Sequence, residues 1–122
     1  YIVPLNFGFT NDKGKITLYF HGAAEGRKAE NIRKNPYVGF ELDIPLGIKT
    51  GETACGFSYR YQSIIGTGKA EMISDPEEKI FALQAIMTKY TKSSDQTFDK
   101  SVLMRTALFK ITVKELSCKE HI

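Results

Sequence analysis

The stretch of sequence that decides the fold is Leu18-Tyr19-Phe20-His21-Gly22-Ala23-Ala24-Glu25-Gly26-Arg27-Lys28. Its first part alternates, so that Leu18 and Phe20 face one way while Tyr19 and His21 face the other, as a β-strand requires. Its second part gathers small residues, two glycines and charged residues, a composition that ends a strand and opens a helix. We therefore expect a strand that passes through a short turn into a helix.

The sequence on either side of this stretch predicts further strands and helices. Residues 1–9 alternate with a period of two, and we expect an edge or bulged strand there because Pro4 donates no hydrogen bond. Asn11, Asp12 and Gly14 are turn formers that predict a hairpin with residues 16–21. The other expected elements are a helix over residues 25–34 that Asn35-Pro36 ends, a strand over 37–42, a mobile loop over 43–53, a strand region over 54–73 broken at 66–68, a helix from Asp75, a loop over 91–100, and a strand over 109–113.

Two of these elements carry specific signals. Asp75 as N-cap, Pro76 at the first helical position and Glu78 three residues after the cap form a capping-box signature. The apolar stripe that we expect on this helix is Ile80, Leu83, Met87 and Tyr90. The glycines of the sequence Gly66-Thr67-Gly68 predict a bulge or a close approach of two backbones.

Strands dominate this pattern and most connections are short, which favours a mainly β (α+β) fold, a small antiparallel barrel flanked by helices. A doubly wound sheet is disfavoured because strict β-α-β alternation is missing. A length of 122 residues predicts one domain over residues 1–122. Because the chain starts inside an apparent strand, we expect a front strand and helix to precede Tyr1.

The composition excludes several classes of function. A net charge of +3, dispersed along the chain, does not suggest a nucleic-acid-binding protein. No apolar run approaches the roughly 20 residues that span a bilayer, and no signal-peptide pattern opens the chain, so we expect a soluble, cytoplasmic protein without membrane contact. Cys55 and Cys118 lack the spacing of a metal site, and no metal is expected. We interpret Cys55 as a buried apolar filler rather than a reactive thiol.

The helix predicted after Gly26 begins with two cations in its first turn, Arg27 and Lys28. The N-terminus of a helix carries a partial positive charge, so each cation there costs about 0.3–1 kcal/mol, whereas Arg33 and Lys34 near the C-terminus are favoured. A bound phosphate would explain this placement, because Arg and Lys side chains and free backbone N–H groups all bind phosphate oxygens. An ordinary solvated basic pair explains it equally well.

Two nucleotide-binding motifs do not account for these residues. The segment from Gly22 to Lys28 is one residue short of a P-loop between its glycines, and Ala29 stands where Ser or Thr should bind magnesium. The sequence Gly66-Thr67-Gly68 lacks the third glycine of a dinucleotide fingerprint and lies within strand character.

The chain resembles the pyridoxamine 5'-phosphate oxidase-related FMN-binding split-barrel family, and most of all its nitroimidazole-resistance (Nim) branch. Five groups of residues carry the resemblance, in order and at similar spacing: Tyr1-Ile2-Val3-Pro4-Leu5-Asn6-Phe7, Leu18-Tyr19-Phe20-His21-Gly22-Ala23, Gly26-Arg27-Lys28, Asn31-Ile32-Arg33 with Asn35-Pro36, and Tyr61-Gln62-Ser63-Ile64-Ile65-Gly66 with Gly68-Lys69-Ala70. The sequence departs from the family at Leu116-Ser117-Cys118-Lys119, where many relatives carry Thr-Gly-Lys.

The resemblance implies an antiparallel six-stranded split β-barrel with flanking helices, assembled as a homodimer with FMN at the subunit interface. It implies that Arg27 and Lys28 bind the FMN phosphate, and that Val3, Pro4, Leu5 and Asn6 lie along the isoalloxazine ring. The same resemblance places Phe20 and His21 beside the ribityl chain and ring, and Tyr61 and Ser63 at the phosphate end or the ribityl hydroxyls. We interpret His21 as a proton donor or substrate contact, since histidine changes its protonation near neutral pH.

The implied function is that of an FMN-dependent oxidoreductase, with nitroimidazoles or other nitroaromatic compounds as its small-molecule substrates. Vitamin B6 oxidation of the pyridoxamine 5'-phosphate oxidase type is the weaker alternative, because no second basic cluster for a substrate phosphate is found. A flavin-binding module without turnover, or a relative that binds haem or a deazaflavin, stays open. No nicotinamide-binding motif is recognisable, so the electron donor stays open too.

Overall fold

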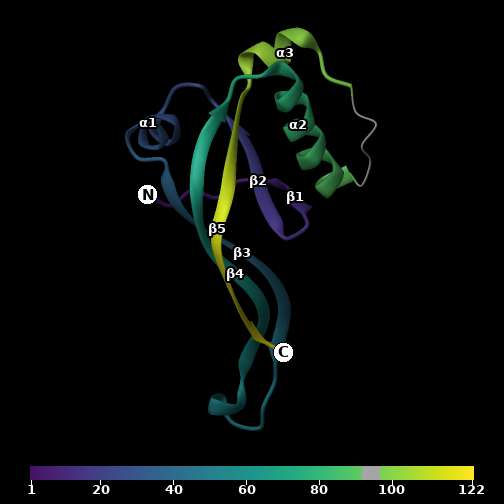
Figure 1. The fold of residues 1–122 in the computed structure, drawn as a ribbon. Coiled ribbons are helices and arrows are strands. Elements are labelled where there is room, and N and C mark those ends of the chain that lie inside the picture. Colours follow the sequence, from purple (N-terminus) through teal and green to yellow (C-terminus); the bar gives the residue numbers. More distant parts are fainter. Residues whose placement is uncertain (92–96) are drawn as a thin grey trace. The chain divides into compact units, whose positions relative to one another are not determined.

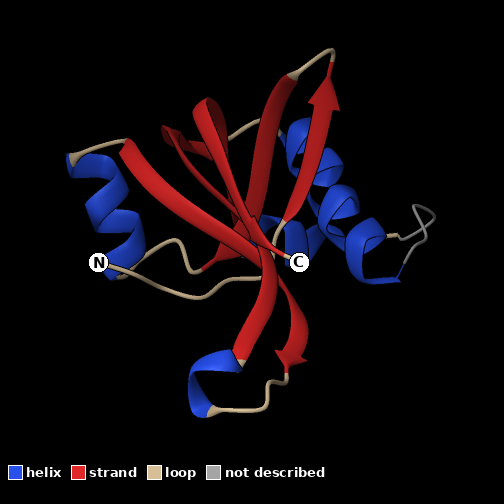
Figure 2. Cartoon of the chain, turned by 90° about the horizontal axis from the view of Figure 1, so that it is seen from below, coloured by secondary structure: helices blue, strands red, loops and turns tan. Residues whose placement is uncertain are grey.

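The computed structural model describes residues 1–91 and 97–122. Five antiparallel strands form one sheet in the order β1-β2-β5-β4-β3, and helices accompany it (Figures 1 and 2). The elements are β1 (Gly8–Asp12), β2 (Lys15–Gly22), α1 (Arg27–Lys34), β3 (Tyr37–Lys49), the 3-10 helix η1 (Ala54–Gly56), β4 (Ser58–Ile73), α2 (Pro76–Thr91), α3 (Lys100–Arg105) and β5 (Ala107–His121). The mainly β class is confirmed, but the sheet has open edges at β1 and β3, and a six-stranded split barrel is not confirmed.

The chain divides into two compact units. The first comprises Tyr1–Val38 and Gly68–Val113, and the second comprises Gly39–Thr67 and Lys114–Ile122. All of the buried apolar side chains in the described residues belong to the first unit.

In the first unit, the hairpin of β1 and β2 follows the sequence prediction. Lys13 and Gly14 have positive φ angles of 53° and 90°, and the Gly14 amide donates to Asn11 Oδ1 over 2.9 Å. Turns of this kind match the twist of the two strands they join. The predicted range of the first strand, residues 1–9, is wrong, however. Residues 1–7 have no regular structure, and β1 begins at Gly8.

Strand β2 lies between β1 and β5 and is buried on both faces. Phe20 stacks on Phe109 of β5, with ring centroids 5.0 Å apart and an interplanar angle of 9°. On the other face, Tyr19 packs with Leu108 and with α2, where it contacts Phe81 edge to face. The alternation of residues predicted the two faces of this strand correctly, but it could not reveal their partners, which lie far away in the sequence.

Helix α2 begins as its sequence predicts. The Asp75 carboxylate accepts a hydrogen bond from the Glu78 amide over 3.1 Å, and this bond caps the helix. The Glu78 side chain does not complete a capping box. It accepts a hydrogen bond from Lys110 Nζ over 2.5 Å, and this bond raises the pKa of Lys110 against the opposing effect of partial burial.

The buried face of α2 differs from the expected stripe. Ala82 and Ile86 are buried, with Leu83 and Ala85 packed beside them, whereas Ile80 and Tyr90 at the ends of the predicted stripe are 36% and 49% exposed. The reason is a close approach of backbones, since a Cβ atom at Gly8 of β1 would overlap the backbone of Ala85 and Ile86. Small residues therefore face the sheet at the centre of the helix.

The second unit corrects three further expectations. Strand β3 continues to Lys49 through the segment expected as a mobile loop, which an edge position permits because Pro45 needs no ladder partner there. Strand β4 is continuous through residues 66–68, so the expected break is wrong, whereas the expected close approach is confirmed: a Cβ atom at Gly66 would overlap the Phe40 ring and lie 2.7 Å from the Glu115 carbonyl oxygen. Cys55 is exposed in η1 and is not a buried filler.

The described residues show neither a membrane-spanning helix nor a cluster of metal ligands. None of the described helices combines the length and the apolar character needed to cross a membrane. In the same part of the chain, no three His, Cys, Asp or Glu side chains gather where they could bind a metal ion.

The contact between Gly8 and α2 predicts a difference between two glycine substitutions. We expect Gly8→Ala to lower the free energy of unfolding by about 1–3 kcal/mol, because the new methyl group meets the helix backbone, which cannot move aside. Gly39→Ala is the control, since the nearest atom to a Cβ there is 3.8 Å away, and it should change stability by less than about 0.5 kcal/mol. Urea unfolding of both variants measures the difference, and equal effects would contradict the close approach.

Candidate functional site

The connection from β2 to α1 forms a helix start without a capping side chain. Strand β2 ends at Gly22, and Gly26 occupies the N-cap position with φ 137° and ψ −179°, a conformation that favours glycine. The Glu30 amide donates to the Gly26 carbonyl over 3.0 Å and closes the first turn. No side chain caps the helix, so backbone N–H groups of the first turn lie open at the positive end of the helix dipole.

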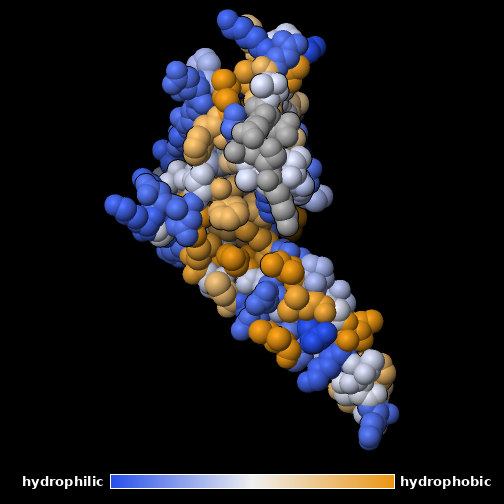
Figure 3. All heavy atoms as spheres, turned by 90° about the vertical axis from the view of Figure 1, so that its right-hand side faces the viewer, coloured by the Kyte–Doolittle hydropathy of each residue, from blue (hydrophilic) through white to orange (hydrophobic). Residues whose placement is uncertain are grey.

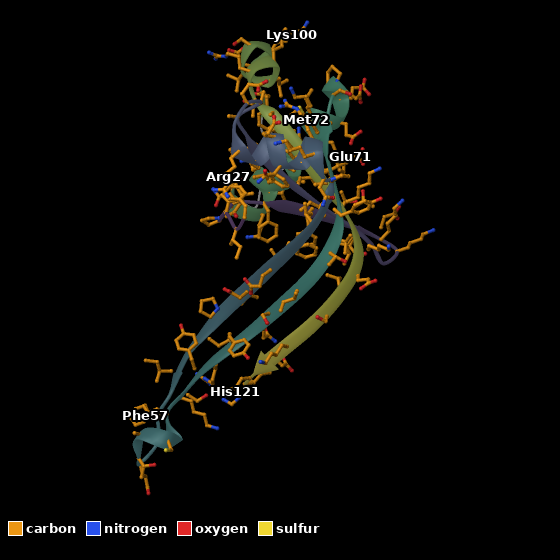
Figure 4. The ribbon with its side chains drawn as sticks, turned by 90° about the vertical axis from the view of Figure 1, so that its left-hand side faces the viewer. Arg27, Phe57, Glu71, Met72, Lys100 and His121 are labelled. Atoms are coloured by element: carbon orange, nitrogen blue, oxygen red, sulfur yellow. The ribbon has the colours of Figure 1, made fainter. Side chains whose placement is uncertain are left out.

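Arg27 and Lys28 occupy this first turn, as the sequence predicts. The Arg27 guanidinium lies 4.3 Å from the centre of the Tyr1 ring and is exposed beside the helix start (Figure 4). Lys28 is half-buried, and its ammonium lies 5.9 Å from the centres of the stacked rings of Phe20 and Phe109. Within the part of the chain that the structure describes, neither cation has a carboxylate partner.

Lys28 also lies directly over the end of β2. A Cβ atom at Gly22 would overlap Lys28 Nζ and lie 2.9 Å from Cε. A glycine at this position therefore lets the lysine side chain run across the strand end, where it reaches the aromatic pair. Sequence reasoning placed the lysine at the helix start but could not find the rings beneath it.

The cations at the other end of α1 are balanced by carboxylates. Glu30 pairs with Arg33 over 3.7 Å and with Lys34 over 3.8 Å, and Glu25 lies 3.6 Å from Arg33. The helix therefore neutralises its C-terminal cations, although the dipole already favours them there, and leaves its N-terminal cations unpaired. This contrast is what a site for an external anion requires.

The segment with Val3, Pro4, Leu5 and Asn6 is exposed and is fixed at both of its ends. Tyr1 contacts Arg27, and the Phe7 amide donates to the Tyr90 hydroxyl over 3.2 Å. The side chains of residues 3–6 are exposed, and they belong to a stretch without regular structure. The contact of Tyr1 brings the beginning of this segment to the start of α1, a proximity that no spacing in the sequence could reveal.

The remaining predicted site residues differ in their surroundings. Phe20 is buried under Lys28 and supports the site, while His21 is exposed at the end of β2, in register with Leu108 of β5. Tyr61 and Ser63 lie on β4 in the second unit, where Tyr61 is half-buried and the Ser63 hydroxyl donates to the Lys119 carbonyl over 3.2 Å. Their roles at a cofactor stay predictions.

Comparison with known proteins identifies the family. Residues 1–120 match the family model described as pyridoxamine 5'-phosphate oxidase. The chain belongs to this family. No curated protein sequence gives a significant match.

Solved structures agree with membership of the pyridoxamine 5'-phosphate oxidase family. A candidate 5-nitroimidazole antibiotic resistance protein from Bacteroides thetaiotaomicron is 36% identical with a TM-score of 0.78, and the match covers 97% of this chain and 67% of that one. A flavocytochrome from Azotobacter vinelandii (20% identity, TM-score 0.76, 100% and 56% covered) and an FAD- and haem-binding protein from Mycobacterium smegmatis (18%, 0.75, 97% and 58%) share the fold. The chain thus spans between about half and two thirds of these proteins. The expected likeness to the nitroimidazole-resistance branch is confirmed.

Proposed function

We propose that this protein binds FMN at the start of α1 and acts as an FMN-dependent oxidoreductase on nitroaromatic compounds. The observation that carries the proposal is the uncapped first turn of α1 with its two unpaired cations, Arg27 and Lys28. Membership of the family supports a flavin as the ligand, and both FAD-binding and flavocytochrome proteins share the fold.

The chemistry of the first turn suits the phosphate group of a flavin nucleotide. A phosphate with two negative charges offsets the cost of placing cations at the positive end of a helix, and it accepts bonds from the free backbone N–H groups. Arg27 offers a planar fork and Lys28 a point charge, which together can bind several phosphate oxygens. The Lys28 ammonium lies 5.9 Å from the ring centres of Phe20 and Phe109, beside this turn.

The rest of the ligand would extend from this phosphate along residues already named. Val3, Pro4, Leu5 and Asn6 offer exposed backbone and apolar surface to a flat ring, and their segment is fixed at Arg27 by Tyr1. His21 is exposed at the adjacent strand end and is our choice for a proton donor to the substrate. In this proposal Tyr61 and Ser63 contact the ribityl or phosphate end. FMN would supply electron transfer, while the protein supplies binding and orientation.

A test of the phosphate assignment removes both first-turn cations. The purified protein should bind one FMN per chain and turn yellow, and Arg27→Ala with Lys28→Ala should weaken FMN binding by about 100-fold or more, because two charge-assisted contacts are lost. Lys15→Ala with Lys34→Ala removes two other exposed lysines of the first unit and should leave the affinity within about threefold. Fluorescence titration with FMN, and with FAD for comparison, measures these affinities.

Two outcomes of this titration would count against the proposal. Stoichiometric FMN in the first-turn double variant would refute the role of Arg27 and Lys28. A wild-type protein that binds neither FMN nor FAD, or that binds haem instead, would refute a flavin site altogether.

The nitroaromatic substrate is suggested by the 36% identical protein from Bacteroides thetaiotaomicron. We expect the holoprotein, reduced without oxygen and mixed with a 5-nitroimidazole, to regain the absorbance of oxidised flavin faster than free reduced FMN at the same concentration. Stopped-flow absorbance measures this rate. If no nitroaromatic compound reoxidises the holoprotein, the protein is a flavin-binding module without this activity, and the reductase proposal fails while the flavin site stands.

We further propose that two copies of the chain assemble as a homodimer through the second unit. This unit buries no apolar side chain of its own in the described residues, although strands of this length need a covered apolar face to be stable. Figure 3 shows apolar side chains on the surface of the hairpin formed by β3 and β4. Those exposed in this unit include Ile44, Ile48, Phe57, Tyr59, Ile65 and Leu116. Exposed apolar surface of this kind is typical of an interface.

Sedimentation velocity tests the assembly. The wild-type protein should sediment at twice the chain mass of 13.7 kDa, and Ile48→Asp should shift it toward the monomer, because the 64% exposed Ile48 costs little to replace in one chain but much in an interface. Met104→Asp is the control, since Met104 is 80% exposed on α3 of the first unit. A clean wild-type monomer would contradict the assembly, and one that binds FMN tightly would also contradict an FMN site at the subunit interface.

A further inference from the structure

The loop between β2 and α1, residues 23–26, is held by a side chain from the far end of the helix. Arg33 lies in the last turn of α1, and its Nη2 donates to the carbonyl oxygen of Ala24 over 3.0 Å. The same nitrogen lies 3.6 Å from Glu25 Oε1, while Nη1 lies 3.7 Å from Glu30 Oε2. One guanidinium thus joins the loop before the helix to the first turn within it.

This contact spans most of the helix. Arg33 lies six positions after Arg27, about 9 Å along the axis at the usual rise per residue. Helical side chains lean toward the N-terminus, so a long arginine can return toward the loop. The bond ties a carbonyl of the loop at residues 23–26 to a side chain of the helix. Gly26 at the N-cap position has no side chain that could hold the loop.

The charges show that Arg33 serves a different purpose from Arg27 and Lys28. Glu25 and Glu30 flank its guanidinium, whereas the first-turn cations have no carboxylate partner in the described part of the chain. A cation flanked by two carboxylates attracts an external phosphate less strongly than an unpaired cation does, because the carboxylates offset its charge. Its contribution is therefore to the shape of the loop.

We propose that Arg33 is a positioning residue. It fixes residues 24–26, and through them the start of α1, so that the open backbone N–H groups of the first turn point to one place where a phosphate binds. This inference rests on the proposed function. Backbone N–H groups bind an anion best when they are fixed before the anion arrives, because ordering a loop during binding costs conformational entropy. Loss of the arginine would free the loop and weaken the binding of phosphate without touching the flavin ring.

The test compares two ligands that differ only in the phosphate, FMN and riboflavin, on the full chain. Arg33→Lys keeps the positive charge and the apolar stem but cannot span both the loop and Glu30, and we expect it to weaken FMN binding about tenfold. Arg33→Met should do so at least as much. Riboflavin affinity should change less than twofold in both variants. The thermal midpoint of the ligand-free Arg33→Lys protein should change by less than a few degrees.

Lys34→Met is the matched control. It removes a cation of the same turn that also pairs with Glu30, and among the described residues the bond to the Ala24 carbonyl comes from Arg33 and not from Lys34, so FMN affinity should stay within about twofold. Fluorescence titration measures all the affinities. An Arg33→Lys variant that binds FMN as the wild type does would overturn the inference, and so would an equal loss for FMN and riboflavin, which would indicate a general effect on the fold. Failure of the wild-type protein to bind FMN would instead overturn the proposed function, and the inference with it.

Discussion

The stack of Phe20 on Phe109 is the contact on which the arrangement of the first unit depends. It joins strand β2 to its neighbour β5, the central strand of the sheet, with ring centroids 5.0 Å apart, and aromatic pairs of this kind contribute about 0.5–1.5 kcal/mol beyond their buried area. The face of the stack also lies near the Lys28 ammonium, 5.9 Å from each ring. The contact that joins the two strands therefore also lies beside a charged side chain of the helix start.

Helix α1 is built so that its two ends differ in charge compensation. Glu30 serves both Arg33 and Lys34, and Arg33 in turn reaches Glu25 and the Ala24 carbonyl. A sequence selected only for helix stability would place carboxylates in the first turn and cations in the last. The structure follows this rule at the C-terminal end and breaks it at Arg27 and Lys28. Local violations of such rules are found where function requires them, and the surrounding contacts make up the cost.

The parts of this structure that could be predicted from the sequence are those set by neighbouring residues. The turn at Gly14, the cap at Asp75 and the cations at the start of α1 each follow from chemistry within a few positions. The errors arose where distant residues decide the outcome. Strand β3 continues past Pro45 because it lies at an edge of the sheet, and the buried face of α2 is set by Gly8, far away in the sequence.

The same distinction applies to the candidate site. Arg27 and Lys28 were predicted as phosphate ligands because cations in the first turn of a helix are locally unfavourable, and the ordered resemblance supplied the flavin. Their role at a cofactor stays a prediction. Tyr1 and Arg33 were missed as members of the site, since their contacts join segments that no periodicity relates. Residues that bind a ligand directly must carry its complementary chemistry, so they leave a signal in the sequence. Residues that only hold a loop in place can be of many types, and it takes the geometry of the folded chain to distinguish Arg33 from the neighbouring Lys34.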